Sequence, residues 1–419
     1  MSTATLERPA LRLRALPLRC HVCGHEHEAA PIAVCEQCLG PLEPIYPARQ
    51  LPDRSTIASR PRSIWRYREF LPFEGAPIHS LDTGCTPLIE SVPLARLLGV
   101  TRVWIKNDSV SHPTLSFKDR VVASAINAAA AFGLTTIGCA STGNLANAVA
   151  AHAARAGLAA WIFIPESLEP AKIAATAIYG CKLVRVRGTY DDVNRLCTQV
   201  ADRFGWGLVN INLRTYYGEG SKTVAFEVAE QLGWRLPDAV VAPMAGGALV
   251  TRLRKGFQEF IDAALVSGTL PRLYGAQADG CAPIVRLIEN GGATIQPVVP
   301  DTVARSLAIG NPADGLLATA AIRESGGWAA AVTDAELVNG IQQLAHTSGV
   351  FTETAGGVTL AAALKLAKAG HFRPSDEVVL CITGNGLKTI DAIAPVIDCG
   401  PVIEPRIREV AALVGSNDN

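Results

Sequence analysis

From residue 103 onward, short apolar runs alternate with longer alanine-rich segments. The short runs are rich in β-branched residues and end near glycine or small polar residues, which is typical of strands. They predict strands at residues 102–106, 135–139, 160–164, 182–185, 239–242, 272–276 and 377–382. The longer segments predict helices at residues 119–132, 144–156, 170–179, 190–204, 220–232 and 249–264. Such alternation predicts an α/β fold with parallel sheets flanked by helices.

The N-terminal part of the chain has a different pattern. A proline-rich passage between residues 44 and 77 predicts a connector that wraps the surface. We therefore expect an arm and a small module in residues 1–45, a main body in residues 46–400 and a tail in residues 401–419. Residues 1–19 carry several arginines and faintly resemble a transit peptide, but Pro9 and Pro17 would interrupt its helix, which favours a loose arm.

Composition narrows the classes of function. Of 419 residues, 49% are hydrophobic and 18% charged, enough apolar material for a large core. Basic and acidic side chains balance at 38 each, so no net positive field favours nucleic acid as a partner. No stretch approaches the roughly 18 uninterrupted apolar residues of a membrane-spanning helix. We expect a soluble protein of the cytoplasm that binds neither nucleic acid nor membrane.

The chain has 11 cysteines, and four of them are clustered near its start. Two C-x-x-C pairs separated by eleven residues are typical of a small zinc ribbon, whose closed tetrahedral site has a structural role. The predicted ligands are Cys20, Cys23, Cys35 and Cys38. Three nearby histidines could replace a ligand, namely His21, His25 and His27. The alternative is four reduced thiols in a degenerate ribbon without metal. The scattered cysteines, such as Cys139 and Cys381, are interpreted as buried thiols in a reducing compartment.

Three predicted strands run into loops that contain glycine and open a helix. Such loops gather main-chain N–H groups that bind anions. Ser141-Thr142-Gly143-Asn144 is small and polar enough to receive a carboxylate, and Ala245-Gly246-Gly247-Ala248 lacks bulky side chains and could hold a phosphate. Thr383-Gly384-Asn385-Gly386 ends a strand with a hydroxyl group instead of an acid. None of these loops matches the dinucleotide-binding or P-loop motif.

Lys118 lies in the segment Ser-His-Pro-Thr-Leu-Ser-Phe-Lys-Asp-Arg, residues 111–120. Ser116 and Asp119 resemble a capping box, which predicts Lys118 in the first turn of a helix. The helix dipole disfavours an ammonium group there, and this favours a nucleophilic amine. Taken alone, such a lysine is more often a surface side chain. Together with a phosphate cradle, a carboxylate loop and a hydroxyl group, it meets the needs of pyridoxal phosphate.

With these motifs the sequence resembles the fold type II pyridoxal-phosphate enzymes and, within them, the threonine synthase family. The similar segments are Pro113–Arg120, Ala140–Asn144, Ile309–Pro312, Gly84–Leu88, Glu219–Thr223 and Phe351–Ala355. The cysteine ribbon resembles the N-terminal extension of one subgroup. The resemblance implies a two-lobed architecture with parallel or mixed sheets, in which residues 111–235 form a smaller, mobile lobe, and it suggests a homodimer.

The resemblance also implies residue roles. Lys118 would bind the cofactor's aldehyde, Asn144 its phenolic oxygen, and Thr383 would face its ring nitrogen. The cofactor's phosphate would be held by main-chain N–H groups of Ala245, Gly246, Gly247, Ala248 and Leu249. The substrate's carboxylate would be bound by Ser141, Thr142 and Gly143. The implied reaction converts O-phospho-L-homoserine and water to L-threonine and phosphate, with the freed amine of Lys118 moving protons.

Several positions depart from the common pattern of that family. His112 and Leu115 replace Asn and Gly, and Ala245 and Leu249 replace Gly and Asn, but main-chain N–H groups do not depend on the side chain. Ala308 stands where some members have arginine. The counter-charge for a substrate phosphate must then come from elsewhere, and the unranked candidates are Lys222, Arg185, Arg187 and Arg305.

Two alternative functions stay open at this point. The first is a paralogue that performs β-replacement or β-elimination, such as a cysteate-synthase-like enzyme that uses phosphoserine, or a serine/threonine dehydratase. Fold analogy does not separate these reactions. The second is a non-catalytic binding protein that keeps the scaffold and uses its ribbon for interactions. The intact Lys118 and Thr383 argue against the second alternative.

Overall fold

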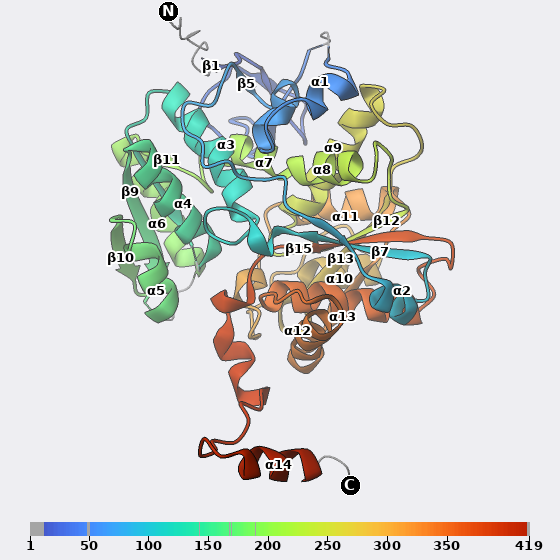
Figure 1. Ribbon diagram of the computed structural model, residues 1–419. Coiled ribbons are helices and arrows are strands. Elements are labelled where there is room, and N and C mark those ends of the chain that lie inside the picture. Colours follow the sequence, from blue (N-terminus) through green and yellow to red (C-terminus); the bar gives the residue numbers. More distant parts are fainter. Residues whose placement is uncertain are drawn as a thin grey trace, which may run out of the picture.

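The computed structural model describes residues 12–47, 51–141, 143–166, 168, 170–188 and 190–416. Two sheets with helices packed against them form the two lobes of the body, and a small antiparallel sheet lies near the N-terminus (Figure 1). This arrangement confirms the predicted α/β fold with parallel and mixed sheets.

The larger sheet has the strand order β14-β13-β12-β15-β7-β6 and is parallel except for β6. Its strands are Ala329–Val332 (β14), Arg272–Ala278 (β13), Ala239–Pro243 (β12), Glu377–Ile382 (β15), Arg102–Asn107 (β7) and Leu88–Glu90 (β6). Every residue of β12 is buried, because helices cover both faces of the sheet. A strand covered on both sides needs apolar side chains on both sides, which explains the continuous apolar runs.

Helices α8, α9 and α11 lie on one side of this sheet, and α2, α12 and α13 lie on the other (Figure 1). Their bounds are Thr223–Gln231 (α8), Ala248–Asp262 (α9), Gly315–Glu324 (α11), Val92–Leu98 (α2), Asp334–Ser348 (α12) and Thr354–Lys368 (α13), and α10 spans Pro283–Glu289. Gly340 of α12 faces Gly357 of α13, where a Cβ on Gly340 would lie 2.5 Å from the Gly357 carbonyl oxygen. The two helices therefore pack backbone to backbone.

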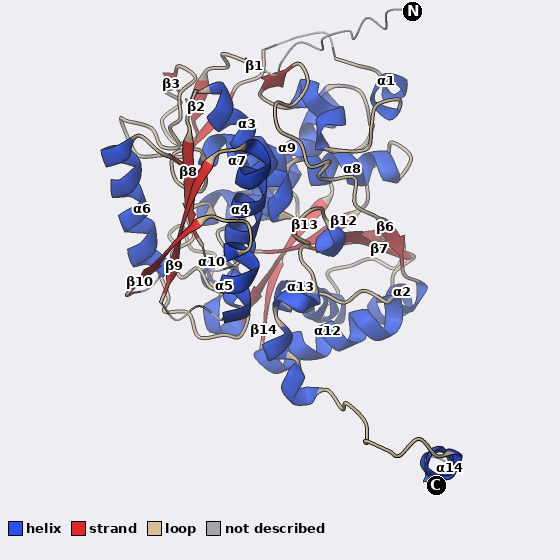
Figure 2. Ribbon diagram, turned by 60° about the vertical axis from the view of Figure 1, so that its left-hand side comes forward, coloured by secondary structure: helices blue, strands red, loops and turns tan. Residues whose placement is uncertain are grey.

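The smaller sheet is entirely parallel, with the order β10-β9-β8-β11. Its strands are Lys182–Val186 (β10), Ala159–Pro165 (β9), Thr136–Ala140 (β8) and Gly207–Leu208 (β11). Figure 2 shows α6 on one side and α4 with α5 on the other. The helices of this region are Lys118–Ala131 (α3), Asn144–Ala156 (α4), Pro170–Ala177 (α5), Tyr190–Phe204 (α6) and Arg214–Ser221 (α7). These elements fall within residues 111–235, whose mobility stays a prediction.

The predicted strands are all present, with ends within two residues of the prediction. The helix predicted at residues 220–232 differs, because α7 ends at Ser221 and a separate helix, α8, begins at Thr223. Of the strands in the two main sheets, β6, β11 and β14 were not predicted, and β6 and β11 have only three and two residues. The alanine-rich β14 lacks β-branched residues except at its end.

The N-terminal module is a ribbon of three antiparallel strands in the order β3-β2-β4. They span Glu26–His27 (β3), Leu18–Cys20 (β2) and Leu42–Pro44 (β4). A separate pair joins Arg12–Leu13 (β1) to Phe73–Glu74 (β5). The module therefore has its own hydrogen-bonded sheet, although the boundaries predicted near residues 45 and 400 stay predictions.

The proline-rich connector is more than a surface wrap. It contains α1 (Arg54–Ala58) and a 3-10 helix over Ile64–Phe70. Tyr67 and Phe70 are buried, and each ring lies 5.3 Å from that of Phe226 in α8. The burial of these aromatic side chains could not be predicted from the proline spacing, because prolines indicate where regular structure ends but not where side chains point. Further 3-10 turns span Asp108–Val110, Asp279–Cys281, Arg305–Leu307, Gly386–Lys388, Ile390–Ala392 and Ala394–Val396.

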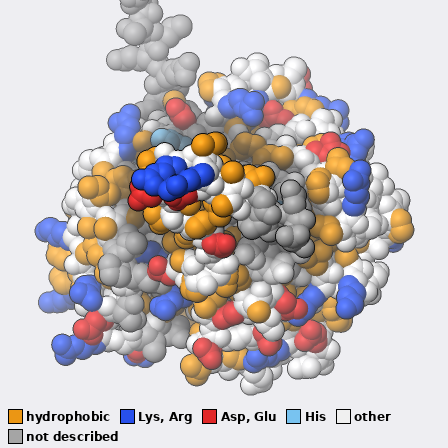
Figure 3. Space-filling model, turned by 60° about the horizontal axis from the view of Figure 1, so that its bottom comes forward, with side chains coloured by type: hydrophobic (Ala, Val, Ile, Leu, Met, Phe, Trp, Pro, Cys, Tyr) orange, Lys and Arg blue, Asp and Glu red, His pale blue; other side chains and the backbone are white. Residues whose placement is uncertain are grey.

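The C-terminal segment leaves the body and ends in α14 (Ile407–Ser416), which stands apart from the two lobes in Figures 1 and 2. Several of its apolar side chains are exposed, Val402 completely. In the view of that side of the molecule, hydrophobic side chains surround a small group of charged ones (Figure 3). None of the helices in the described residues is long and apolar enough to cross a membrane.

Candidate active site

One cavity of about 250 Å³ gathers most of the residues that the sequence analysis singled out. Ser141, Gly143, Asn144, Lys118, Thr383 and all of residues 245–249 line it, whereas Thr142 lies outside the described residues. The three glycine loops follow the carboxyl ends of β8, β12 and β15. Ligands of open parallel sheets bind at these ends, because the loops there converge. The cavity therefore brings together residues that are more than 250 positions apart in the sequence.

Lys118 is the first residue of α3, as predicted, but the capping box does not form. The Asp119 carboxylate instead accepts hydrogen bonds from the amide and the hydroxyl group of Thr114, at 3.0 and 2.8 Å. The buried Ser116 hydroxyl has no hydrogen-bond partner. The turn is held from outside the helix, because the amide of Phe117 donates to the carbonyl oxygen of Thr383 at 2.8 Å. This bond fixes the start of α3 against the end of β15.

The Lys118 amine donates a hydrogen bond of 2.7 Å to the hydroxyl oxygen of Tyr217 in α7. The same amine lies 5.0 Å from the centre of the Phe117 ring and 5.4 Å from that of Tyr217. Both aromatic rings also line the cavity. Tyr217 was not predicted from sequence, because no local motif marks a residue 99 positions away as a partner of the lysine.

Glu353 is a second residue that the sequence analysis missed, although its segment was among those with a family resemblance. It is 2% exposed and lies at the start of α13, in the wall of the cavity. Asn144 donates to its carboxylate at 2.8 Å, and Thr383 donates at 3.5 Å. Burial raises the pKa of Glu353, against the opposing effects of the Asn144 hydrogen bond and of the charges on Lys388, Lys172 and Lys118. Glu353 therefore joins two of the predicted cofactor ligands.

The loop before α9 forms an open backbone cradle. Gly247 has φ 92°, and a Cβ there would lie 2.9 Å from both the Ala318 Cβ and the Asp314 carbonyl oxygen, so the position favours glycine. A Cβ on Gly246 would meet only the Ile309 side chain, at 3.9 Å. The Asp314 amide donates to the Gly246 carbonyl oxygen at 3.0 Å, which holds the loop in place. Main-chain N–H groups at the start of α9 suit a phosphate.

Basic side chains at the cavity differ from most of those proposed from sequence. Arg305 lines the cavity, but Lys222, Arg185 and Arg187 do not. Lys222 is completely buried beside Glu219, and Arg187 pairs with Glu166 on the surface. Arg214, at the start of α7, also lines the cavity and pairs with Asp314 at 2.5 Å. Sequence position alone could not rank these cations, because which of them reach the cavity depends on how α7 and the smaller sheet pack.

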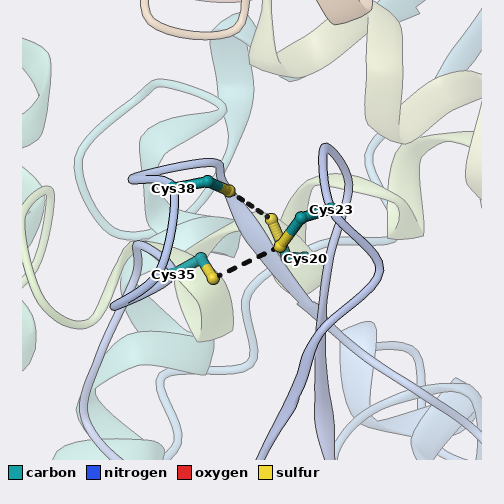
Figure 4. Close-up of side chains that lie close together, drawn as sticks. All are labelled: Cys20, Cys23, Cys35 and Cys38. Carbon is teal, nitrogen blue, oxygen red and sulfur yellow. Dashed lines mark hydrogen bonds between the residues drawn. The ribbon is translucent and has the colours of Figure 1, made fainter.

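The four cysteines of the ribbon face one another (Figure 4). The Cys20 and Cys38 sulfurs are 3.4 Å apart, those of Cys23 and Cys35 are 3.6 Å apart, and all four lie within 4.8 Å of one another. Sulfurs around a tetrahedral zinc ion, at Zn–S distances of about 2.3 Å, would be about 3.8 Å apart. Among the described residues this is the only group of His, Cys, Asp or Glu side chains arranged to hold a metal.

The two C-x-x-C loops also have matching backbone contacts. The Val22 amide donates to the Cys20 sulfur at 3.3 Å, and the Gln37 amide donates to the Cys35 sulfur at 3.4 Å. Amide donors of this kind stabilise thiolates, the form that binds metal. His27 lies 3.3 Å from the Cys35 sulfur as a neighbour of the four thiols. The residues present therefore fit a zinc ion with four cysteine ligands.

Comparisons with known proteins agree with this geometry. A family model described as "Pyridoxal-phosphate dependent enzyme" matches residues 79–384. The threonine synthase of Methanocaldococcus jannaschii is 36% identical over 380 residues, which cover 89% of this chain and 93% of that protein. The threonine synthase of Methanosarcina acetivorans is 34% identical over 395 residues, or 93% and 96% of the two chains. Maize serine racemase superposes with a TM-score of 0.60 at 21% identity, covering 76% and 91%, and shares the fold.

The family match spans most of the chain and includes every residue proposed to hold the cofactor, which defines the class as a pyridoxal-phosphate-dependent enzyme. The cavity supplies what this class needs, namely a lysine amine beside an open backbone cradle. Because the identity to these two relatives extends over nearly their whole length, the chain belongs to the threonine synthase family.

Proposed function

We propose that the protein converts O-phospho-L-homoserine and water to L-threonine and phosphate. The observation that carries the proposal is the convergence of Lys118, Asn144, the Gly246–Gly247 cradle and Thr383 on one cavity, in a chain related throughout to threonine synthases. The small-molecule substrate, an amino-acid phosphate, needs a site for its carboxylate and a site for its phosphate. The cavity has candidates for both.

The residues that would hold the cofactor fit its parts. Lys118 would hold it through its aldehyde carbon, the main-chain N–H groups of residues 245–249 would bind its phosphate, and Asn144 would bind its phenolic oxygen. The hydroxyl group of Thr383 would face the ring nitrogen. When bound, the cofactor supplies an electron sink for negative charge on the substrate's carbons.

The residues of the chain would then handle protons and anions. Once the substrate's amino group had replaced it, the Lys118 amine would act on the α carbon and then on the β carbon, and it would give up the first proton before taking the second. Tyr217 orients this amine through the 2.7 Å hydrogen bond. Ser141, Thr142 and Gly143 would bind the substrate's carboxylate. Arg214 and Arg305 are the arginines that line the cavity, and they would attract the phosphate that leaves from the γ carbon.

The experiment that tests the reaction supplies the purified protein with pyridoxal phosphate and compares two substrates. With O-phospho-L-homoserine we expect threonine and phosphate in equal amounts, and with O-phospho-L-serine little phosphate. Phosphate release from phosphoserine alone would replace the proposal with the β-replacement or β-elimination alternative. Inactivity with both substrates would contradict both reactions.

The ribbon is proposed to hold one structural zinc ion on Cys20, Cys23, Cys35 and Cys38. The support is the mutual approach of the four sulfurs and the paired amide donors. We expect metal analysis of the purified protein to find about one zinc per chain. A Cys35→Ser variant should lose the metal, whereas Cys399→Ser, which changes an exposed cysteine far from the ribbon in sequence, should retain it. Well under one zinc per chain in the unaltered protein would contradict the site.

Two further expectations belong to the proposal. The family resemblance implies a homodimer, and the exposed apolar side chains of the C-terminal segment, Val402 among them, are consistent with burial against a second copy. A cytoplasmic location is supported by the 11 cysteines, none of which is in a disulfide.

A further inference from the structure

The ribbon contacts helices α7 and α9, both of which contribute residues to the cavity lining. Thr215 of α7 donates a hydrogen bond to the carbonyl oxygen of Ile32 in the ribbon at 2.9 Å. The next residue, Tyr216, donates to the carbonyl oxygen of Ala30 at 3.1 Å. Tyr217 follows directly and points the other way, toward Lys118. One turn of α7 thus contacts the ribbon on one side and the reactive lysine on the other.

A group of buried and partly buried charges joins the ribbon to α7 and α9. Its cations are Lys222, Arg252 and Lys255, and its carboxylates are Glu43, Glu219 and Glu259. Glu43, on strand β4, is the carboxylate that the ribbon contributes. It lies 3.0 Å from the Lys255 amine and 3.2 Å from the Arg252 guanidinium. We name this group the junction cluster.

An aromatic side chain that follows the ribbon, Tyr46, two residues after strand β4, also contacts the junction cluster. The hydroxyl group of Tyr46 donates to Glu219 at 2.5 Å, and its ring centre lies 4.2 Å from the Lys222 amine. Without Glu43 the three cations would face two carboxylates in a partly buried place, where an unbalanced charge is unfavourable. Although burial alone would raise it, the pKa of Glu43 is held well below its usual range by Lys255, by the hydrogen bond from His21 and by Arg252. Glu43 is therefore an ionised partner of α9.

The junction cluster is connected to the cavity through close backbone packing. Arg252 lies one turn after Ala248 and Leu249, which form part of the cradle. A Cβ on Gly218 of α7 would lie 2.9 Å from the Arg252 guanidinium, and a Cβ on Gly256 of α9 would lie 2.7 Å from the Lys222 carbonyl oxygen. Because α7 and α9 are this closely packed, a shift of α9 would displace both α7 and the cradle at the start of α9.

We infer that the ribbon is a positioning element for the cofactor, and that Glu43 is the residue through which it acts. By pairing with Arg252 and Lys255, Glu43 sets the place of α9 and hence of the cradle at its start. A ribbon that is folded around its metal holds Glu43 in contact with α9. Loss of the metal therefore weakens the binding of the cofactor's phosphate by the cradle. This inference rests on the proposed cofactor site.

The test compares Glu43→Gln with Glu26→Gln, which makes the same chemical change in the ribbon. Glu26 pairs with Arg19, and both side chains are about half exposed, away from α9. The protein without cofactor is titrated with pyridoxal phosphate and, separately, with pyridoxal, which lacks the phosphate, and binding is followed by visible absorbance. We expect Glu43→Gln to reduce the preference for pyridoxal phosphate over pyridoxal about fivefold or more. Glu26→Gln should leave it unchanged.

A general loss of structure would weaken the binding of both ligands and leave the ratio of their affinities unchanged. An unchanged affinity ratio in Glu43→Gln therefore overturns the inference. If Glu43→Gln does not fold, Tyr46→Phe, which removes only the hydroxyl group on Glu219, is measured in the same way. An unchanged ratio in that variant then has the same meaning.

Metal removal provides the second arm. Treating the unaltered protein with a chelator should lower the ratio of the affinities for pyridoxal phosphate and pyridoxal. The same treatment of Glu43→Gln should not lower this ratio further, because metal removal and the substitution both act through the contact of Glu43 with α9. Equal falls in both proteins would overturn the role of Glu43. These measurements use no phosphohomoserine, so they are independent of the proposed reaction. An unaltered protein with no preference for pyridoxal phosphate would overturn the cradle and, with it, this inference.

Discussion

Lys118→Ala is expected to abolish the visible absorbance of the lysine-bound cofactor and to reduce turnover by about a thousandfold or more. The reason is that the variant loses both the amine that holds the cofactor and the group that moves protons. Lys118 is the only lysine among the cavity-lining residues that the structure describes, so no second amine is in place to substitute for it. Absorbance after mixing with pyridoxal phosphate and threonine formation from phosphohomoserine measure the two losses.

The matched control for this change is Lys368→Ala. Lys368 is an exposed lysine at the end of α13, outside the cavity, and its removal should leave both measurements unchanged. Lys118→Arg keeps a positive charge but offers no amine that can hold the aldehyde, so it should resemble Lys118→Ala. Threonine formation by either Lys118 variant at a tenth or more of the original rate would contradict the role of Lys118.

Arg120→Met is expected to lower the free energy of unfolding by about 3–5 kcal/mol. Arg120 is completely buried behind the Lys118 turn and contacts the Asp108 carboxylate at 2.6 and 2.8 Å. It also bonds to Glu227, whose other close cation is Lys106 at 2.6 Å. Methionine fills much of the space but leaves Asp108 without its cation in a buried place. Chemical denaturation of both proteins measures the difference.

The control for charge alone is Arg102→Met on strand β7. Arg102 is about half exposed and pairs with Glu377 at 3.2 Å, so its loss should cost at most about 1 kcal/mol. Similar losses of stability for the two variants would show that burial of the Arg120 pairs is not the cause.

The free energy of unfolding measured at acidic pH gives a second test of the role of Arg120. Burial alone would raise the pKa of Glu227, but Arg120 and Lys106 lower it to about 2, from the usual 4.5. A carboxylate with a depressed pKa in the folded state stabilises the fold fully above pH 4.5, and this contribution is lost as the pH falls toward 2. Arg120→Met should therefore flatten the loss of stability over this range.

The sequence predicted the elements that depend on local pattern. Strands that are buried on both faces require continuous apolar runs, and this requirement placed β12 and β15 correctly. The glycines of the cradle are visible in sequence because a backbone with φ 92° at Gly247 favours a residue without a Cβ. Cysteine spacing predicted the ribbon, because the two C-x-x-C loops form two short turns whose sulfurs meet.

Failures of prediction share a physical cause as well. Ser116 and Asp119 have the spacing of a capping box, but Asp119 bonds to Thr114, and the Phe117 amide is satisfied by Thr383 from another strand. A local rule cannot account for a competing partner that arrives through tertiary packing. The same limit applies to the phosphate candidate Lys222, which lies in the junction cluster, outside the cavity lining.

The α/β class, the position of Lys118 in the first turn of a helix, the glycine loops and the cysteine ribbon could be predicted from sequence, because backbone geometry and side-chain periodicity act within a few residues. Tertiary structure alone decided which distant side chains meet. Tyr217 reaches Lys118, Glu353 joins Asn144 to Thr383, and Glu43 of the ribbon pairs with α9. These contacts depend on how helices and sheets pack over separations of 30 to 209 residues, and no local pattern records that packing.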